Sequence, residues 1–571
     1  MKQALWLLVV LFMLGGLAAC NPEPAATQPP ATQPAAAEPV ATQPAPAATA
    51  VPPQRKVATF AWTQEPDTLN PYYTNMWFSA ILHQFYNCWA WEYDDENVTF
   101  PRLVTEIPSV DNGGVSEDGL VITMNLRDDI VWSDGTPITA ADFIFTYQMV
   151  VDPANTVASV YPYDYVASVE GIGDRTVVMT FSEPFSPWES TLWHGLLPKH
   201  VLEPVFQSKG SIDEAPWNLA PTVGCGPLDF VKWESGSYVQ FVRNPNYWLG
   251  ASRLDEVFVQ IVPDDASQTA ALIAGDADLG TFPPLSDVPR LQAAGLEILT
   301  INSGYAEGWF FDYRETALPG ALDLKVRQAV AMAIDREAIN RDLLQGLSVP
   351  ANTLWDALEG AGYVSPDIVP WTYNPEGAKQ LLEEAGWTDT DGDGIREDAA
   401  GNKLVLRHGT TTREIRQDVQ AVAQQMLRQV GIDLQISNYE SGYFFSSYTD
   451  GSPCALGELD IMEWSDTTGS FPDPDHYYWL CSELPDEESP WGANYFGCDE
   501  VLDELFQRQI VTIDPDERAA IVREITQYIH DQVYWYGIWV DPDYWVVGKR
   551  LTGYQFSGIT PFYGILEWDI Q

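Results

Sequence analysis

Hydrophobic residues recur with a helical period in three long stretches of the chain. The stripes are Val326, Ala329, Val330, Ala333 and Ile334; then Ala378, Leu381, Leu382 and Ala385; and then Val419, Val422, Ala423, Met426, Leu427 and Val430. Spacings of three and four residues place the members of each stripe on one face of a helix. We interpret the stripes as the core faces of amphipathic helices, not as cofactor-binding sites.

Capping residues predict where several helices begin. Thr139 is placed to be an N-cap, with Asp142 at the third helical position to complete a capping box. Further helix starts are predicted at Asp335, at Asn374, which Pro375 follows, and at the capping-box pattern of residues 514–517.

Strand patterns lie between the predicted helices. Residues 256–262 alternate apolar and polar positions, a helix over 267–274 ends at Gly275, and a second strand should contain Asp278 and Leu279. Another strand is expected over 403–407. Because helix and strand signals alternate from Lys56 to the end, the sequence predicts a large α/β body that contains lobes.

The first 55 residues have a different character. Residues 4–19 are apolar but shorter than the ~20 residues that span a bilayer, and small residues precede Cys20. This pattern predicts a signal peptide over residues 1–19, and Leu17-Ala18-Ala19-Cys20 resembles the bacterial lipobox, in which the cysteine is lipidated. Residues 20–55 are rich in Pro, Ala, Thr and Gln and are interpreted as a tether. We therefore expect an extracytoplasmic protein, anchored by lipid to the cell membrane.

The charge and cysteine content narrow the functional classes. With 29 basic and 81 acidic residues, the formal charge is −52, which argues against nucleic acid as a partner. Cys481 and Cys498 bracket a loop rich in Pro, Glu and Gly, and we favour a disulfide between them. The partners of Cys88, Cys225 and Cys454 stay open.

Motifs for catalysis are scarce. The chain has no HExxH, GxSxG or P-loop pattern, and its histidines lack metal-ligand spacing. A secreted hydrolase that uses two carboxylates stays open, because so many acids make close pairs inevitable. No cofactor is expected to be required.

One segment resembles the first half of a calcium-binding loop. The matching residues are Asp389, Asp391, Asp393 and Gly394. The second half does not match, because the twelfth position is Ala400, and Glu397 and Asp398 are offset from it. A structural calcium ion and a simple Asp/Gly turn both stay open.

Ordered sequence blocks carry a family resemblance. They are EPDTLNP from Glu65, WSDGTPITAADFIFTY from Trp132, GCGPLDF from Gly224, RNPNYW from Arg243, LIAGDADL from Leu272, VRQAVAMAIDREAI from Val326 and YNPEGAKQLLEEAGW from Tyr373. Together they resemble the peptide- and nickel-type (family 5) extracytoplasmic solute-binding proteins of ABC importers. The resemblance covers most of residues 56–571.

The resemblance implies a two-lobe periplasmic-binding-protein-like α/β fold of type II, with an enlarged lobe I and a ligand cleft between the lobes. Lobe I would span residues 56–301, lobe II residues 302–539, and residues 540–571 would return to lobe I. The implied protein is a monomer and not an enzyme. It would capture a solute and deliver it to the permease and ATPase subunits of a transporter. An oligopeptide or dipeptide is the leading ligand; an oligosaccharide, a nickel complex or another small solute are alternatives.

The resemblance also implies site residues. Peptide binders of the family hold the ligand's α-ammonium with a carboxylate that follows a tryptophan and precedes an Asp-Pro segment. Asp466 matches this role, since it follows Trp464 and precedes residues 472–475, although it lies one residue closer to the tryptophan. Arg413 is the candidate partner for a ligand carboxylate. Aromatic residues in segments that approach the family's cleft are Tyr86, Trp89, Trp91, Tyr305 and Trp464.

Overall fold

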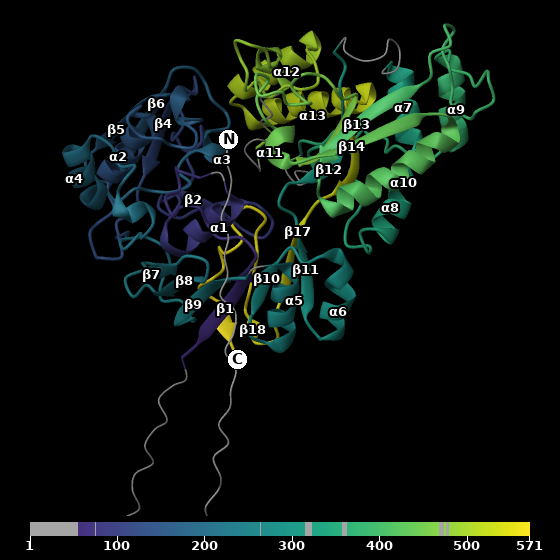
Figure 1. The fold of residues 1–571 in the computed structure, drawn as a ribbon. Coiled ribbons are helices and arrows are strands. Elements are labelled where there is room, and N and C mark those ends of the chain that lie inside the picture. The colour runs from purple at the N-terminus through teal and green to yellow at the C-terminus, as the bar shows by residue number, and fades with distance from the viewer. Residues whose placement is uncertain are drawn as a thin grey trace, which may run out of the picture. The chain divides into compact units, whose positions relative to one another are not determined.

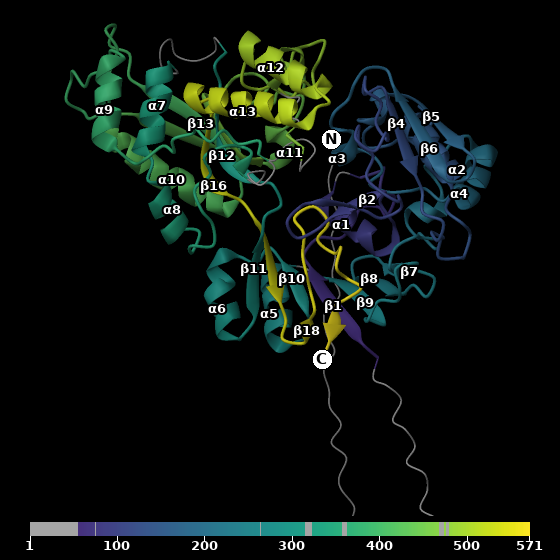
Figure 2. The same ribbon diagram turned by 180° about the vertical axis from the view of Figure 1, so that it is seen from behind.

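The computed structural model describes residues 55–74, 76–262, 264–314, 323–356, 362–466, 473–474 and 479–571, and these belong to one compact unit. Figures 1 and 2 show the ribbon from opposite sides. The predicted signal peptide, Cys20 and nearly all of the tether lie outside the described residues, as do Pro472 and Asp475. Within the described part of the chain, no helix is long and apolar enough to cross a membrane.

A seven-stranded mixed sheet contains the first strand of the unit. In spatial order its strands are β11 (Glu297–Ile301), β17 (Asp543–Val547), β10 (Leu279–Thr281), β1 (Val57–Trp62), β9 (Glu256–Ile261), β8 (Tyr238–Arg243) and β7 (Leu228–Glu234). β1 is parallel to β9 and β10, whereas β17 is antiparallel to β10 and β11. Trp545 and Val547 pack in a large aromatic core, while Val546 packs in the core under helices α5 (Asp265–Ala274) and α6 (Val288–Ala293). The sheet is therefore covered on both faces.

The second large sheet is a five-stranded mixed sheet. Its strands are β14 (Asp433–Tyr439), β13 (Val405–Thr411), β15 (Ile461–Asp466), β12 (Ala306–Phe311) and β16 (Trp535–Val540). Trp309 and Phe311 share a core with helices α7 (Leu324–Ala333), α9 (Pro375–Glu384) and α10 (Glu414–Val430). Phe310 shares another core with α12 (Glu500–Val511) and α13 (Pro515–Gln532). These two helix groups lie on opposite sides of the sheet in Figure 1, as the alternation of side chains along β12 requires.

Smaller elements complete the unit. A three-stranded sheet contains β4 (Val121–Asn125), β6 (Thr176–Phe181) and β5 (Val166–Ile172), and two-stranded ribbons contain β2 (Trp91–Tyr93) with β3 (Thr99–Pro101) and β18 (Leu551–Thr552) with β19 (Asp569–Ile570). The remaining α-helices are α1 (Trp77–Tyr86), α2 (Ala140–Val151), α3 (Trp188–Thr191), α4 (Lys199–Lys209), α8 (Arg336–Asp342) and α11 (Ser441–Phe444). Short 3-10 turns are η1 (Tyr163–Tyr165), η2 (Pro216–Asn218), η3 (Leu285–Asp287) and η6 (Cys481–Glu483).

The predicted helix starts are confirmed. Helix α2 begins after Thr139, whose hydroxyl accepts a hydrogen bond from the Ala141 N–H, while Asp142 accepts one from the Thr139 N–H. Asp335, Asn374 and Asp514 each accept a hydrogen bond from the N–H three residues further on. The strand expected over 403–407 is displaced, because β13 begins at Val405 and continues to Thr411.

The chain changes sheets at two neighbouring places. It leaves the seven-stranded sheet after β11, enters the five-stranded sheet at β12, and returns between β16 and β17. The two connections touch, because the Asp541 N–H donates to the Tyr305 carbonyl at 3.0 Å. This pair of crossings is called the strand crossing below.

Two disulfides join distant and nearby parts of the chain. Cys481 and Cys498 are bonded, which is the pairing that the loop composition favoured. Cys88 is bonded to Cys225 across a separation of 137 residues, and Cys454 is a buried free thiol.

Candidate ligand-binding site

The strand crossing gathers the polar residues that the sequence placed in the cleft. Asp466 ends β15 and is paired with Ala306, the first residue of β12. Tyr305 directly precedes Ala306, and both Asp466 and Tyr305 are partly exposed. Burial, together with the carboxylates of Asp543, Asp466 and Asp541, raises the pKa of Tyr305 to about 12. The carboxylate of Asp466 therefore lies in a concentration of negative charge where the two sheets connect.

A buried charge network lies beside this acidic group. Glu307 is fully buried and accepts hydrogen bonds from Arg416 Nε at 3.0 and 3.1 Å and from Arg416 Nη2 at 3.0 Å. The Ser465 hydroxyl donates to Glu307 at 2.8 Å. We infer that this network holds the end of β15, and hence Asp466, in place, because Ser465 immediately precedes Asp466.

Arg413 occupies this network and does not stand free in solvent. Its guanidinium contacts Asp541 at 2.7 Å, the Ser465 hydroxyl at 3.1 Å and Glu307 at 3.3 Å. Burial alone would raise the pKa of Asp541, but the Arg413 charge and the hydrogen bonds from Arg413, Ser465 and Trp539 together lower that pKa. The Arg413 side chain is 39% exposed. Its guanidinium can therefore contact a ligand from solvent while it stays paired with these acids.

Asp543, unlike Asp541, has a pKa that is raised clearly above its ordinary value. It is 4% exposed, and the Ser303 hydroxyl donates to its Oδ1 at 2.9 Å. Burial raises the pKa of Asp543 to about 7; the Ser303 hydrogen bond opposes this shift and the Asp541 charge adds to it.

The stability of the protein should therefore depend on pH through Asp543. An unfolded Asp loses its proton near pH 4, whereas folded Asp543 keeps its proton until about pH 7. Between these values the folded state binds more protons, so this residue's contribution to the unfolding free energy falls as pH rises from about 4 to 7. We expect Asp543→Asn to gain on the order of 2–4 kcal/mol relative to wild type across that window. Urea unfolding of both proteins at several pH values measures the difference, and parallel pH profiles would contradict it.

A cavity of about 840 Å³ opens between segments that lie far apart in the sequence. One wall comes from β2, β3 and residues 186–190, and the other from Asp473 and the start of α13. The walls meet where the Ser186 N–H donates to the Ile510 carbonyl at 2.9 Å. This volume lies in the range of pockets that enclose small ligands.

Acidic side chains make up most of the charged residues in the lining of the cavity. They are Asp111, Glu117, Glu189, Asp473, Asp514 and Asp516, and Arg518 is the basic residue of this described lining. Arg518 donates to both oxygens of Asp473 at 2.6 Å, and both residues are buried. The Arg518 charge is therefore balanced by Asp473. The other acids of the lining leave the cavity with a negative potential, which favours a cationic group.

Of the aromatic residues named from the sequence, Tyr305 and Trp464 lie near the strand crossing, whereas Tyr86, Trp89 and Trp91 lie in other parts of the unit. Tyr305 lies at the strand crossing, and Trp464 is 9% exposed on β15, where it stacks on Phe310 at 4.2 Å. Tyr86 and Trp91 are fully buried, and Trp89 is 9% exposed and stacked on His194.

Tyr86, Trp89 and Trp91 pack in hydrophobic cores, and their contact with a ligand stays a prediction. Trp91 packs edge-on against Trp188, which lines the cavity, and so helps to position that side chain. The aromatic side chains that line the cavity itself are Tyr93, Trp188 and Tyr363.

Sequence reasoning missed much of the charge network. Glu307, Arg416, Asp541 and Asp543 carried no motif. They come together because β12 pairs with β15 and β16, α10 brings Arg416 to Glu307, and the chain passes through Asp541 from β16 to β17. One signal was present: the pair Asp541 and Asp543 lies at alternating positions within an otherwise apolar stretch, where buried acids are unusual.

Comparison with known proteins identifies a family. The model described as bacterial extracellular solute-binding proteins, family 5 (middle), matches residues 101–486. The oligopeptide-binding protein AppA of Bacillus subtilis is 26% identical over 458 residues, which cover 79% of this chain and 81% of that protein. The glutathione-binding protein GsiB of Escherichia coli O1:K1 is 27% identical over 515 residues, with 87% and 91% covered.

Solved structures agree on the fold. AppA of Bacillus subtilis in complex with a nonapeptide superimposes with a TM-score of 0.67 at 24% identity, covering 90% of this chain and 99% of the other. NikA of Brucella suis in complex with Fe(III)-EDTA gives a TM-score of 0.76 at 20% identity, covering 90% and 100%. The mixed α/β periplasmic-binding-protein fold expected from the sequence is thereby confirmed.

Proposed function

Because this chain belongs to the family 5 extracellular solute-binding proteins of bacteria, we propose that its solute is a peptide, an oligopeptide or dipeptide with a free amino end. The family consists of non-catalytic, substrate-binding components of ABC importers, and this chain is such a component. The two-carboxylate hydrolase that the sequence left open is therefore not supported.

The observation that carries the peptide proposal is the surplus of acids near both candidate contact regions. Asp466 ends β15 beside Tyr305, where a ligand ammonium would meet a carboxylate. The cavity is lined by several acids, and its one described basic residue is already paired. A peptide's α-ammonium suits these surroundings, and peptide backbone groups suit the amide of Asn97 and the hydroxyls of Thr99 and Ser190 in the cavity lining. AppA and GsiB, which are named for an oligopeptide and for glutathione, support the same class.

An oligosaccharide is the second candidate. Tyr93, Trp188 and Tyr363 line the cavity, and flat aromatic faces suit the apolar faces of sugar rings. Neutral sugars carry no positive charge that the carboxylates could attract, and a peptide is therefore preferred.

The proposal includes the attachment of the protein. Lipidated Cys20 would hold it at the outer face of the membrane, and residues 21–55 would let a monomer reach its permease and the associated ATPase subunits. Lipid chains contribute about 0.8 kcal/mol per buried methylene, so a multiply acylated cysteine anchors firmly.

Native mass spectrometry tests the ligand class. The purified chain is incubated with a mixture of free peptides and neutral oligosaccharides, and we expect one intact peptide bound per chain. Exclusive retention of a sugar would replace the peptide proposal with the oligosaccharide one. Release of cleaved peptide in large excess over protein would contradict a binding function altogether.

A further inference from the structure

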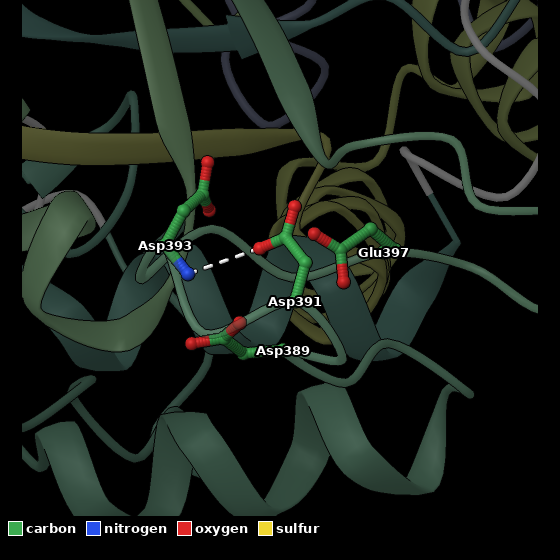
Figure 3. Close-up of side chains that lie close together, drawn as sticks. All are labelled: Asp389, Asp391, Asp393 and Glu397. Carbon is green, nitrogen blue, oxygen red and sulfur yellow. Dashed lines mark hydrogen bonds between the residues drawn. The ribbon is translucent and has the colours of Figure 1, made fainter.

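A hairpin between α9 and β13 brings together the acids of the calcium-like motif. Thr388 and Glu397 close the hairpin, because each backbone N–H donates to the other's carbonyl at 2.9 Å. Asp389, Asp391 and Asp393 are exposed within it. These three residues and Glu397 can each offer a carboxylate oxygen, and the four oxygens all lie within 4.8 Å of one another (Figure 3). We call these four residues the hairpin acids.

Glu397 distinguishes this group from an ordinary acidic turn. It is 3% exposed, and its Oε2 accepts hydrogen bonds from the Thr390 N–H and hydroxyl, both at 2.8 Å. Its Oε1 is buried, and among the described residues no donor reaches it. In Figure 3 the Glu397 carboxylate points toward Asp391 and Asp389. A buried acceptor without a partner costs about 1–3 kcal/mol, and more when charged, so a cation at this place would relieve a real penalty.

The local positive charges do not replace such a cation. The Lys403 ammonium pairs with Asp393 and lies 3.4 Å from Asp391, but its side chain is 40% exposed. One ammonium against four carboxylates leaves three negative charges uncompensated. The neighbouring Arg396 is turned elsewhere, since it donates to the Val430 and Trp387 carbonyls.

The donor set selects the kind of ion. The hairpin acids contribute oxygen donors, which suit a hard cation such as Ca²⁺ and not zinc or copper. Counted from Asp389, the acids stand at positions 1, 3, 5 and 9, and the glycine at position 6 is Gly394, whose φ of +91° permits the sharp turn. Glu397 does not match the calcium-loop pattern, because it is not at the twelfth position. The closed hairpin nevertheless brings its carboxylate close to those of the three aspartates.

We propose that the hairpin acids bind a single Ca²⁺ ion, which fixes the connection between α9 and β13. Backbone carbonyls and water would supply the rest of the coordination that Ca²⁺ requires. Lys403 then acts as a competitor for the same carboxylates. The site is separate from the strand crossing and the cavity, so it does not depend on the ligand proposed above.

Calorimetric titration of the chelator-treated, purified chain with Ca²⁺ alone tests the assignment. We expect one site with Kd on the order of 0.1–1 mM, as in extracellular calcium modules, and binding of Mg²⁺ at least about tenfold weaker. The melting temperature should rise by several degrees when millimolar Ca²⁺ is added, because only the folded chain presents the site. Failure of the wild-type chain to bind Ca²⁺ saturably at millimolar concentration would overturn the proposal.

Three variants locate the ion. Asp391→Asn should weaken Ca²⁺ binding at least about tenfold, whereas Lys403→Gln should strengthen it several-fold by removing the competing charge. Asp398→Asn is the matched control, because it removes one carboxylate from the same segment but outside the hairpin acids, and it should leave the affinity unchanged. Asp391 and Lys403 are exposed, so neither substitution should prevent folding. Undiminished binding by Asp391→Asn would place the ion elsewhere on this acidic chain and overturn the assignment.

Discussion

Asp466→Asn should weaken the binding of a free peptide by about 30-fold or more, with the fold intact. In the proposed complex, the variant would leave the peptide's α-ammonium without its counter-charge where the two sheets connect. Removing one partner of a hydrogen-bonded charge pair at an interface costs about 2–5 kcal/mol, and 2 kcal/mol corresponds to roughly 30-fold. We place the effect at the lower end, because Asp466 is partly exposed. Calorimetric titration with the peptide retained in native mass spectrometry measures it.

A control for this variant lies on the same segment. Glu458 is exposed before β15, so Glu458→Gln removes an equal charge away from the strand crossing and should leave the affinity within about twofold. If Asp466→Asn bound every tested peptide as tightly as wild type, Asp466 would have no role in holding the ammonium.

Arg416→Leu should lower the free energy of unfolding by about 3 kcal/mol or more, the largest stability loss we predict for one charged side chain. It leaves Glu307, which is fully buried, without three of its hydrogen bonds. Breaking a buried ion pair by removing one partner costs about 3–5 kcal/mol, since an uncompensated charge stays in the interior. The contact from Arg413 to Glu307 at 3.3 Å remains and limits the loss. Urea unfolding monitored by tryptophan fluorescence gives the value.

Helix α10 provides the control for Arg416. Arg428 is on the same helix, is 60% exposed and lies 3.9 Å from Asp433, so Arg428→Leu should change the unfolding free energy by less than about 1 kcal/mol. The double variant Glu307→Leu/Arg416→Leu should recover part of the loss, because no buried charge is then left unpaired. Equal effects of Arg416→Leu and Arg428→Leu would show that the buried pair does not support the strand crossing.

Local signals in the sequence predicted the helices well. Thr139, Asn374 and Asp514 are recognisable as caps because the groups they bond lie within three residues. The stripe from Val419 to Val430 likewise predicted a helix, which ends where Gly431 adopts a left-handed conformation. Such features depend on the chain within a few residues, so a single sequence suffices to find them.

Features that depend on distant residues escaped prediction. Tyr86 and Trp91 have the residue types of a binding site, but their burial is decided by strands and loops far along the chain. The bond between Cys88 and Cys225 has no local signature. Asp541 and Asp543 reach Asp466 and Tyr305 only through the return of the chain after β16.

The measurement that most directly tests the account is a thermodynamic cycle on Asp466 and the peptide amino end. Wild type and Asp466→Asn are each titrated with a free peptide and with its N-acetylated form. We predict that acetylation weakens binding to wild type by about 30-fold or more but changes binding to the variant by less than about threefold, because each change removes the same interaction. If acetylation weakened both proteins equally, Asp466 would not contact the ammonium. If neither peptide form bound wild type at all, a peptide would not be the solute.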